Sequence, residues 1–97
     1  MHARTVTVQV QPGKIDEVIR IYRDSIVPAA KQQKGFKGAF LLTDKKTGKG
    51  ISVTLWESEA DMEKGEATGY LREQIGKVAS SFSAPPTTEH YEISVQT

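Results

Sequence analysis

The chain has 97 residues and a mass of 10.7 kDa, which predicts one domain over residues 1–97. The 13 Lys and Arg residues nearly balance the 12 Asp and Glu residues, so we expect no nucleic-acid partner, which would favour a strongly basic chain. The absence of cysteine excludes disulfides, cysteine nucleophiles and thiolate metal sites.

The first third of the chain predicts a strand followed by a helix. Residues 4–11 alternate between valines on one side and polar residues on the other, a pattern typical of a strand. In residues 14–34 the apolar residues recur at spacings of three and four, which predicts a helix with one apolar stripe. Pro28 should kink the last turn of this helix or end its first piece, and Gly35 is a suitable C-terminal stop.

Two further strands are predicted next. Residues 36–43 and 51–57 are rich in apolar and β-branched residues, and they flank the polar, glycine-containing turn at residues 44–50. This arrangement predicts a β-hairpin.

A second helical region is predicted over residues 58–80. Ser58 followed by Asp61 resembles a capping box at the start of a helix. Gly65 and Gly69 should break the region into two helices.

Residues 89–95 predict the last strand, with alternating apolar residues. The order strand, helix, strand, strand, helix, strand indicates a ferredoxin-like βαββαβ fold of the α+β class. Such a fold has a four-stranded antiparallel sheet with helices on one face.

Alternation along the predicted strands divides the sheet into two faces. The face expected to contact the helices carries Val6, Val8, Val10, Phe40, Leu42, Ile51, Val53, Leu55, Tyr91, Ile93 and Val95. The opposite face carries Thr5, Thr7, Gln9, Ala39, Leu41, Thr43, Ser52, Thr54, Trp56, Glu92 and Ser94. Because this second face has few charged residues, we expect another copy of the chain to cover it, with the two sheets packed face to face. A solvated, threonine-rich face is the alternative.

Two short motifs carry a family resemblance. Residues 35–42 read GFKGAFLL at the start of the second strand, and residues 54–61 read TLWESEAD between the third strand and the following helix. With the element order, these motifs resemble the antibiotic biosynthesis monooxygenase superfamily of dimeric α+β barrel proteins, over nearly the whole chain. The resemblance implies a homodimer and a ligand that lies between the helices and the sheet.

The same resemblance implies an activity. Members of the superfamily include cofactor-independent monooxygenases that oxidise anthrone- or quinol-like aromatics, so no cofactor is expected. The haem-degrading branch uses an Asn on the first strand, and a Trp and a His on the second helix. Val6, Gly65 and Ile75 occupy the matching positions here, so we do not expect haem degradation.

The expected ligand-cavity residues are Tyr22, Phe40, Trp56, Met62 and Tyr70. Tyr22 and Tyr70 are the catalytic candidates, because a phenol can hydrogen-bond a substrate hydroxyl and help remove its proton. Packing in the core, with the hydroxyl at the rim, is the alternative for both. Trp56 either stacks on a substrate or closes the end of the sheet or the subunit interface.

Other polar residues predict no further site. His90 should point away from the cavity on the helix side, because the adjacent Tyr91 is assigned to that side. With two histidines at opposite ends of the chain and no cysteine, we expect no metal site.

Two functions therefore stay open. The first is a cofactor-free oxygenase acting on a small aromatic substrate with an acidic hydroxyl. The second is a non-catalytic module that binds a small apolar ligand or only dimerises. A buried polar side chain that points into the cavity would favour the first. No apolar run approaches the length of a membrane span or a signal peptide, so we expect no membrane contact and a cytoplasmic protein.

Overall fold

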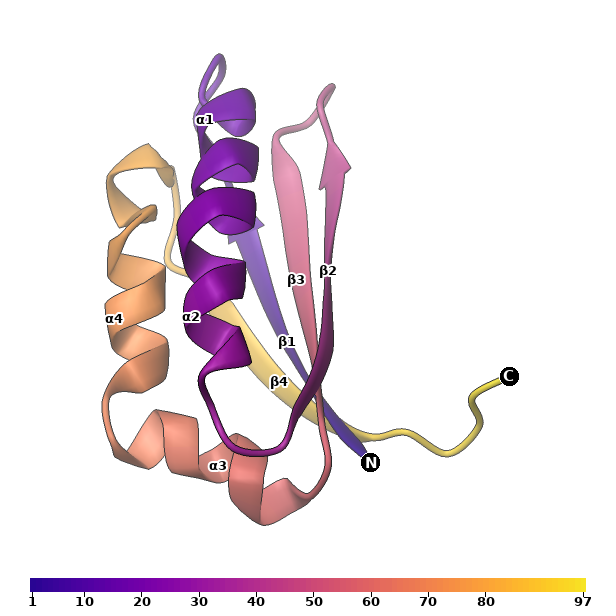
Figure 1. Cartoon of the computed structure of the whole chain (residues 1–97). Coiled ribbons are helices and arrows are strands. Elements are labelled where there is room, and N and C mark those ends of the chain that lie inside the picture. Colours follow the sequence, from indigo (N-terminus) through magenta and orange to yellow (C-terminus); the bar gives the residue numbers. More distant parts are fainter.

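Four antiparallel strands form one sheet in the order β2-β3-β1-β4, and the helices lie on one of its faces (Figure 1). The computed structural model describes residues 1–97. The strands are β1 (His2–Gln9), β2 (Phe36–Asp44), β3 (Lys49–Trp56) and β4 (Thr87–Glu92). The predicted ferredoxin-like α+β fold is confirmed, although the last strand ends three residues earlier than predicted.

The helices between β1 and β2 run without interruption from residue 15 to residue 31. They are α1 (Ile15–Ile21), the π-helical turn η1 (Tyr22–Ile26) and α2 (Val27–Lys31). Pro28 explains the division, because its ring has no amide hydrogen and crowds the carbonyl four residues earlier. The turn widens as a result, and the amide of Val27 donates to the carbonyl of Tyr22, five residues back.

The second helical region contains α3 (Glu59–Ala67), α4 (Tyr70–Gly76) and the short 3₁₀ turn η2 (Ala79–Ser81). Ser58 Oγ accepts a hydrogen bond of 3.1 Å from the amide of Asp61, as the capping pattern predicts. Gly69 separates α3 from α4 with φ at +83°, a conformation that favours glycine. The prediction of a break at Gly65 is wrong, since this residue lies inside α3.

The strand register corrects the predicted sheet faces. Val6 lies opposite Ser52, and Ser52 lies opposite Leu41, so these three residues share the face that the helices cover. Six residues assigned to that face instead lie on the opposite, open face: Phe40, Leu42, Ile51, Val53, Leu55 and Tyr91. Alternation sets only which residues of a strand share a side. Both sides of β2 are apolar, and the more apolar side of β3 is the open one. Assigning the more apolar side of each strand to the helices therefore gave the wrong face for β2 and β3.

The open face consequently exposes large apolar side chains. Phe40, Leu42 and Tyr91 are 56%, 54% and 51% exposed. A patch of this kind on a small domain is typical of a surface that contacts another molecule.

The core lies between the helices and β1. Partly buried apolar residues of α1, η1, α4 and the chain after η2 pack around a centre of five buried valines. The five are Val6, Val8, Val10, Val18 and Val78. Each buried valine contributes about 1.5–3 kcal/mol relative to an exposed one. None of the helices has the length and apolar character needed to cross a membrane.

Candidate functional site

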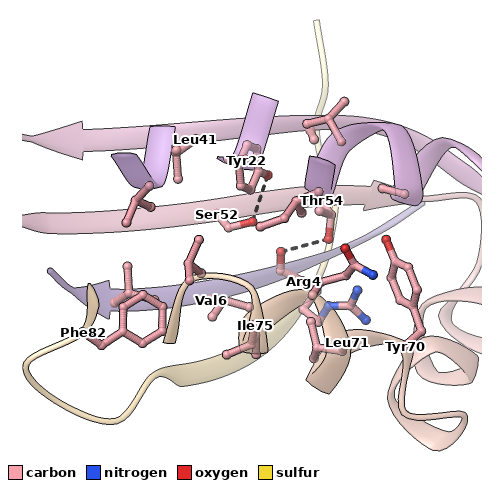
Figure 2. A pocket seen from close by; sticks show the side chains of 18 of the residues that line it. Arg4, Val6, Tyr22, Leu41, Ser52, Thr54, Tyr70, Leu71, Ile75 and Phe82 are labelled. Atoms are coloured by element: carbon pink, nitrogen blue, oxygen red, sulfur yellow. Dashed lines mark hydrogen bonds between the residues drawn. The ribbon is translucent and has the colours of Figure 1, made fainter. Parts of the chain in front are cut away.

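A cavity of about 70 Å³ lies between the sheet and the helices. β1, β2 and β3 form its floor, and α1, η1, α2 and α4 contribute its walls (Figure 2). Of its 19 lining residues, 15 are hydrophobic, so the cavity suits a ligand with an apolar body.

Arg4 is the charged residue of the cavity. It lies on β1 in phase with Val6 and is only 2% exposed. Its Nη1 atom donates a 3.0 Å hydrogen bond to the carbonyl of Met62, and its guanidinium carbon lies 5.3 Å from the ring centroid of Trp56. Its Nε atom is buried and has no hydrogen-bond partner. The cavity therefore contains a cation with one free donor.

Burial lowers the pKa of the Arg4 guanidinium, and the Glu66 carboxylate opposes that shift. The guanidinium of an arginine does not lose its proton in proteins, so the group stays charged at neutral pH. The Glu66 Oε2 atom lies 3.5 Å from Nη1 of Arg4. Burying a cation without full compensation costs free energy, which makes the site attractive to an anion.

Gly65 allows α3 to approach this region closely. A Cβ at residue 65 would lie 3.2 Å from Cδ2 of Tyr70 and 3.7 Å from Nη1 of Arg4. The glycine that was predicted to break a helix instead leaves room for these two side chains. Figure 2 shows Arg4 and Tyr70 toward one end of the cavity and Phe82 toward the other.

The hydroxyl of Tyr22 is a second polar group of the cavity, on the wall opposite α4. Its hydroxyl donates a 3.3 Å hydrogen bond to the carbonyl of Phe40 and lies 2.9 Å from Oγ of Ser52, which then acts as donor. Burial raises the pKa of the Tyr22 phenol, and the Ser52 hydrogen bond opposes this. Burial also raises the pKa of Tyr70, with Arg4 opposing. Both phenols are therefore protonated at neutral pH and act as hydrogen-bond donors.

Gln74 completes the polar groups of the cavity. It lies on α4, is 5% exposed and lines the cavity. Its Oε1 atom is buried and has no hydrogen-bond partner. Nε of Arg4 and Oε1 of Gln74 are thus a buried donor and a buried acceptor without partners in the chain, on two residues that line the cavity.

The family model for antibiotic biosynthesis monooxygenases matches residues 1–77. The chain belongs to the antibiotic biosynthesis monooxygenase family. The resemblance seen in the sequence motifs is thereby confirmed.

Solved structures share the fold of this chain. A crystal structure of an antibiotic biosynthesis monooxygenase superposes with a TM-score of 0.74 at 19% identity, covering 95% of this chain and 97% of that one. A monooxygenase from Streptomyces coelicolor, solved in complex with the ligand nanaomycin D, superposes with a TM-score of 0.74 at 16% identity, covering 99% and 89%. At these identities the likeness establishes the fold alone.

Curated relatives add no activity. An uncharacterized protein of Mycobacterium tuberculosis, Rv2557, is 33% identical over 97 residues, which cover 96% of this chain. A second one, Rv2558, is 29% identical over 96 residues. The chain spans about 41% and 39% of the lengths of these relatives.

In this family member, the five residues predicted to line the cavity divide into two groups. Tyr22, Trp56 and Tyr70 line it. The prediction is wrong for Phe40, whose side chain lies on the open face, and for Met62, which is buried outside the cavity. Only their carbonyl groups reach the site, as acceptors for Tyr22 and Arg4.

Trp56 has a largely structural environment. It is 1% exposed, and its Nε1 atom donates a 2.9 Å hydrogen bond to Oγ1 of Thr54. Its ring meets Phe36 edge-on at 5.6 Å. The indole therefore packs at the end of the sheet while one side faces the cavity and the Arg4 guanidinium.

The predicted orientation of His90 is wrong. The register pairs His90 with Arg4, so it lies on the side of the sheet that the helices cover, although it does not line the cavity. Its Nε2 atom lies 2.8 Å from Oε2 of Glu66. Nowhere in residues 1–97 do three or more His, Cys, Asp or Glu side chains gather in a way that could hold a metal ion.

Arg4, Gln74 and Ser52 line the cavity although the sequence pattern had not placed them there. A signal for Arg4 was present, because it shares the parity of the three valines that were correctly assigned to the helix side. Gln74 lies three residues after Leu71 and four before Val78, so it belongs to the buried stripe of its helical region.

Proposed function

We propose that this chain is a cofactor-independent monooxygenase that oxidises a small aromatic substrate with an acidic hydroxyl, quinol- or anthrone-like. The observation that carries the proposal is the buried Arg4 guanidinium in an otherwise apolar cavity. An aromatic body suits the apolar walls, and an oxyanion suits the cation. Membership of the family and the fold shared with a monooxygenase add support.

Ionisation of the substrate makes it electron-rich enough to reduce dioxygen directly. For a quinol, one oxygen atom enters the ring and the other leaves as water, so that one quinol and one O₂ give one hydroxyquinone and one water. The quinol supplies all four electrons, and no external reductant is needed. The chain contributes by orienting the ring and stabilising the anion through Arg4, and the Tyr70 hydroxyl can donate a hydrogen bond; Tyr22 can do so only if it releases its hydrogen bond to the Phe40 carbonyl.

The pairing of two copies through the open sheet face belongs to the same proposal. Phe40, Leu42 and Tyr91 are about half exposed there, and burying them would remove apolar surface from water. A face-to-face arrangement leaves the helices outside and gives each copy its own cavity.

A non-catalytic module that binds a small ligand is the second candidate. It is favoured by the absence of Asp, Glu, His and Lys from the residues that line the cavity. No lining side chain is a base at neutral pH, so ligand binding without chemistry accounts for the apolar walls equally well.

Oxygen consumption distinguishes the two candidates. The purified chain is mixed with hydroquinones and anthrones in air-saturated buffer without added cofactor, and uptake is compared with autoxidation. We expect uptake above background, one atom of ¹⁸O₂ in the product, and a loss of at least tenfold in Tyr22→Phe or Tyr70→Phe. Arg72→Met, at an exposed position of α4, is the matched control and should keep the full rate. Uptake no faster than autoxidation across the panel would favour the non-catalytic module.

A further inference from the structure

We infer, on the basis of the proposed function, that Arg4 and Gln74 form a head-group subsite that binds a single-ring phenol as its preformed anion. The inference concerns the chemical class of the ligand and the form in which it enters. Three observations carry it: the free hydrogen-bonding atoms, the charges around Arg4 and the size of the cavity.

The unpaired hydrogen-bonding atoms indicate which polar groups a ligand must have. Nε of Arg4 donates and Oε1 of Gln74 accepts, and both are buried without a partner. Both residues line the same cavity. A phenolate oxygen accepts from Arg4, and a second hydroxyl on the same ring, as in a quinol monoanion, donates to Gln74. Such a ligand satisfies both groups, whereas an unsubstituted hydrocarbon satisfies neither.

The charged and titratable groups around Arg4 leave the cation available. Glu66 of α3 lies 3.5 Å from one guanidinium nitrogen, and the same carboxylate contacts His90 of β4. Tyr70 of α4 and Tyr22 of η1 are neutral phenols that add no negative charge. A phenolate at Arg4 therefore competes with the partly exposed Glu66 carboxylate, whose ion pair with the guanidinium is long at 3.5 Å.

The same set of groups explains why the anion is preformed. A site that removes a proton from its substrate needs a base within hydrogen-bond reach. The lining residues include neither carboxylate nor imidazole nor amine, and both tyrosines retain their protons. The ligand's proton is therefore lost to solvent, and the cavity selects the ionised form because of Arg4.

The cavity volume limits the ring system. A cavity of about 150 Å³ holds one benzene molecule, and this one has about 70 Å³. Even a single ring requires the helical wall to move outward slightly, and a three-ring anthrone requires much more. Among the proposed substrates, single-ring quinols are therefore favoured.

The test uses 4-nitrophenol, which ionises near neutral pH and whose anion absorbs visible light. Its neutral isostere 4-nitroanisole is the control ligand. We expect the affinity for 4-nitrophenol to rise about tenfold per pH unit below the ligand's own pKa, as the anion population does. The bound ligand should show the anion's absorbance while the free ligand is still protonated. Binding of 4-nitroanisole should be at least tenfold weaker and independent of pH. Equal affinities for the two ligands would overturn the inference.

Two variants connect the binding to the named residues. Arg4→Gln removes the cation and should lower 4-nitrophenolate affinity at least tenfold. Because this change also removes a buried ion-pair partner and risks unfolding, Gln74→Glu is the second test. It places a carboxylate in the subsite and should abolish phenolate binding while 4-nitroanisole binding is retained. Arg72→Met should bind both ligands as the unchanged chain does. Undiminished phenolate binding by folded Gln74→Glu would contradict the assignment.

The outcomes separate this inference from the proposed activity, since 4-nitrophenol binding needs no turnover. Phenolate binding without oxygen uptake on any quinol supports the subsite and overturns the oxygenase. Oxygen uptake without selective phenolate binding supports the oxygenase and overturns the subsite.

Discussion

The Oε2 atom of Glu66 lies 3.5 Å from Nη1 of Arg4, and the same oxygen lies 2.8 Å from Nε2 of His90. Glu66 is the one carboxylate within ion-pair distance of Arg4, and its side chain is 29% exposed. Solvent and the contact with His90 therefore both weaken the ion pair between Glu66 and the Arg4 guanidinium. The buried cation is only partly compensated within the chain, which is the electrostatic basis for anion binding.

Replacing Glu66 with Gln should strengthen phenolate binding and weaken the fold. Removal of the competing carboxylate leaves the ligand as the sole anion at Arg4, so we expect a three- to tenfold gain in 4-nitrophenolate affinity. The free energy of unfolding should fall by about 1–3 kcal/mol, because a buried charged donor loses its partner. Ligand titration and urea unfolding measure the two effects. Glu63→Gln, at an exposed position of α3, should change neither. Weaker phenolate binding in Glu66→Gln would contradict the charge argument.

Gly65→Ala should affect binding more than stability. A helical alanine is favoured over glycine by about 1 kcal/mol, but the new Cβ would lie 3.2 Å from Cδ2 of Tyr70, which lines the cavity, so the ring would have to shift. We expect the free energy of unfolding to change by less than about 1 kcal/mol and the affinity for 4-nitrophenolate to fall severalfold. Gly76→Ala is the matched control, because its Cβ would have no neighbour within 4 Å. Equal affinities in the two variants would show that Gly65 does not position Tyr70.

Local patterns in the sequence predicted the elements well, because capping, turns and periodicity act over a few residues. Ser58 caps a helix as the pattern indicates. The helix was expected to kink or end at Pro28, but the helical residues continue from 15 to 31. The consequence of Pro28 differed, since the chain widened into a π turn that begins at Tyr22 and kept one helical direction. The effect of Pro28 depended on how the helix packs against the sheet, and the spacing of residues in the sequence does not show this packing.

The sheet faces were harder to predict because alternation carries no absolute direction. β2 presents Phe40 on one side and Leu41 on the other, and only the pairing with β3 shows that Leu41 faces the helices. The same ambiguity hid the candidate site. Arg4 was in register with the correctly assigned valines, yet a charged residue near the chain start was not considered for a buried position.

The open sheet face should hold two copies of the chain together. Phe40→Glu and Leu42→Glu each place a charge on the exposed apolar face, at strand β2, and burying an unpaired charge opposes association. We expect light scattering at micromolar concentration to give twice the 10.7 kDa of one chain, and the double variant to give the single mass. Gln32→Glu adds one charge on the exposed side of the helical layer and should leave the mass unchanged. A single mass for the unchanged chain would contradict this pairing.

Alkaline pH should destabilise the fold through Tyr22. Burial raises the pKa of its phenol in the folded state, whereas in the unfolded chain a tyrosine ionises at about pH 10. Below that pH both states are protonated, and this group leaves stability independent of pH. Above it the unfolded chain loses its proton first, so stability falls until the folded pKa is passed, with a slope of up to about 1.4 kcal/mol per pH unit.

Tyr22→Phe tests this linkage directly. The variant should lose about 1 kcal/mol at neutral pH, because the hydrogen bonds to Ser52 and the Phe40 carbonyl disappear. Its alkaline loss of stability should be shallower, although still present, since burial raises the pKa of Tyr70 as well. Ser52→Ala is the control that removes the hydrogen-bond partner but keeps the phenol. Because Ser52 lowers the pKa of Tyr22, this variant should retain the full alkaline loss and begin from a lower stability. Urea unfolding on both sides of pH 10 measures the stability of all three chains. If stability falls with pH equally steeply in Tyr22→Phe and Ser52→Ala, the buried phenol does not cause the loss of stability at alkaline pH.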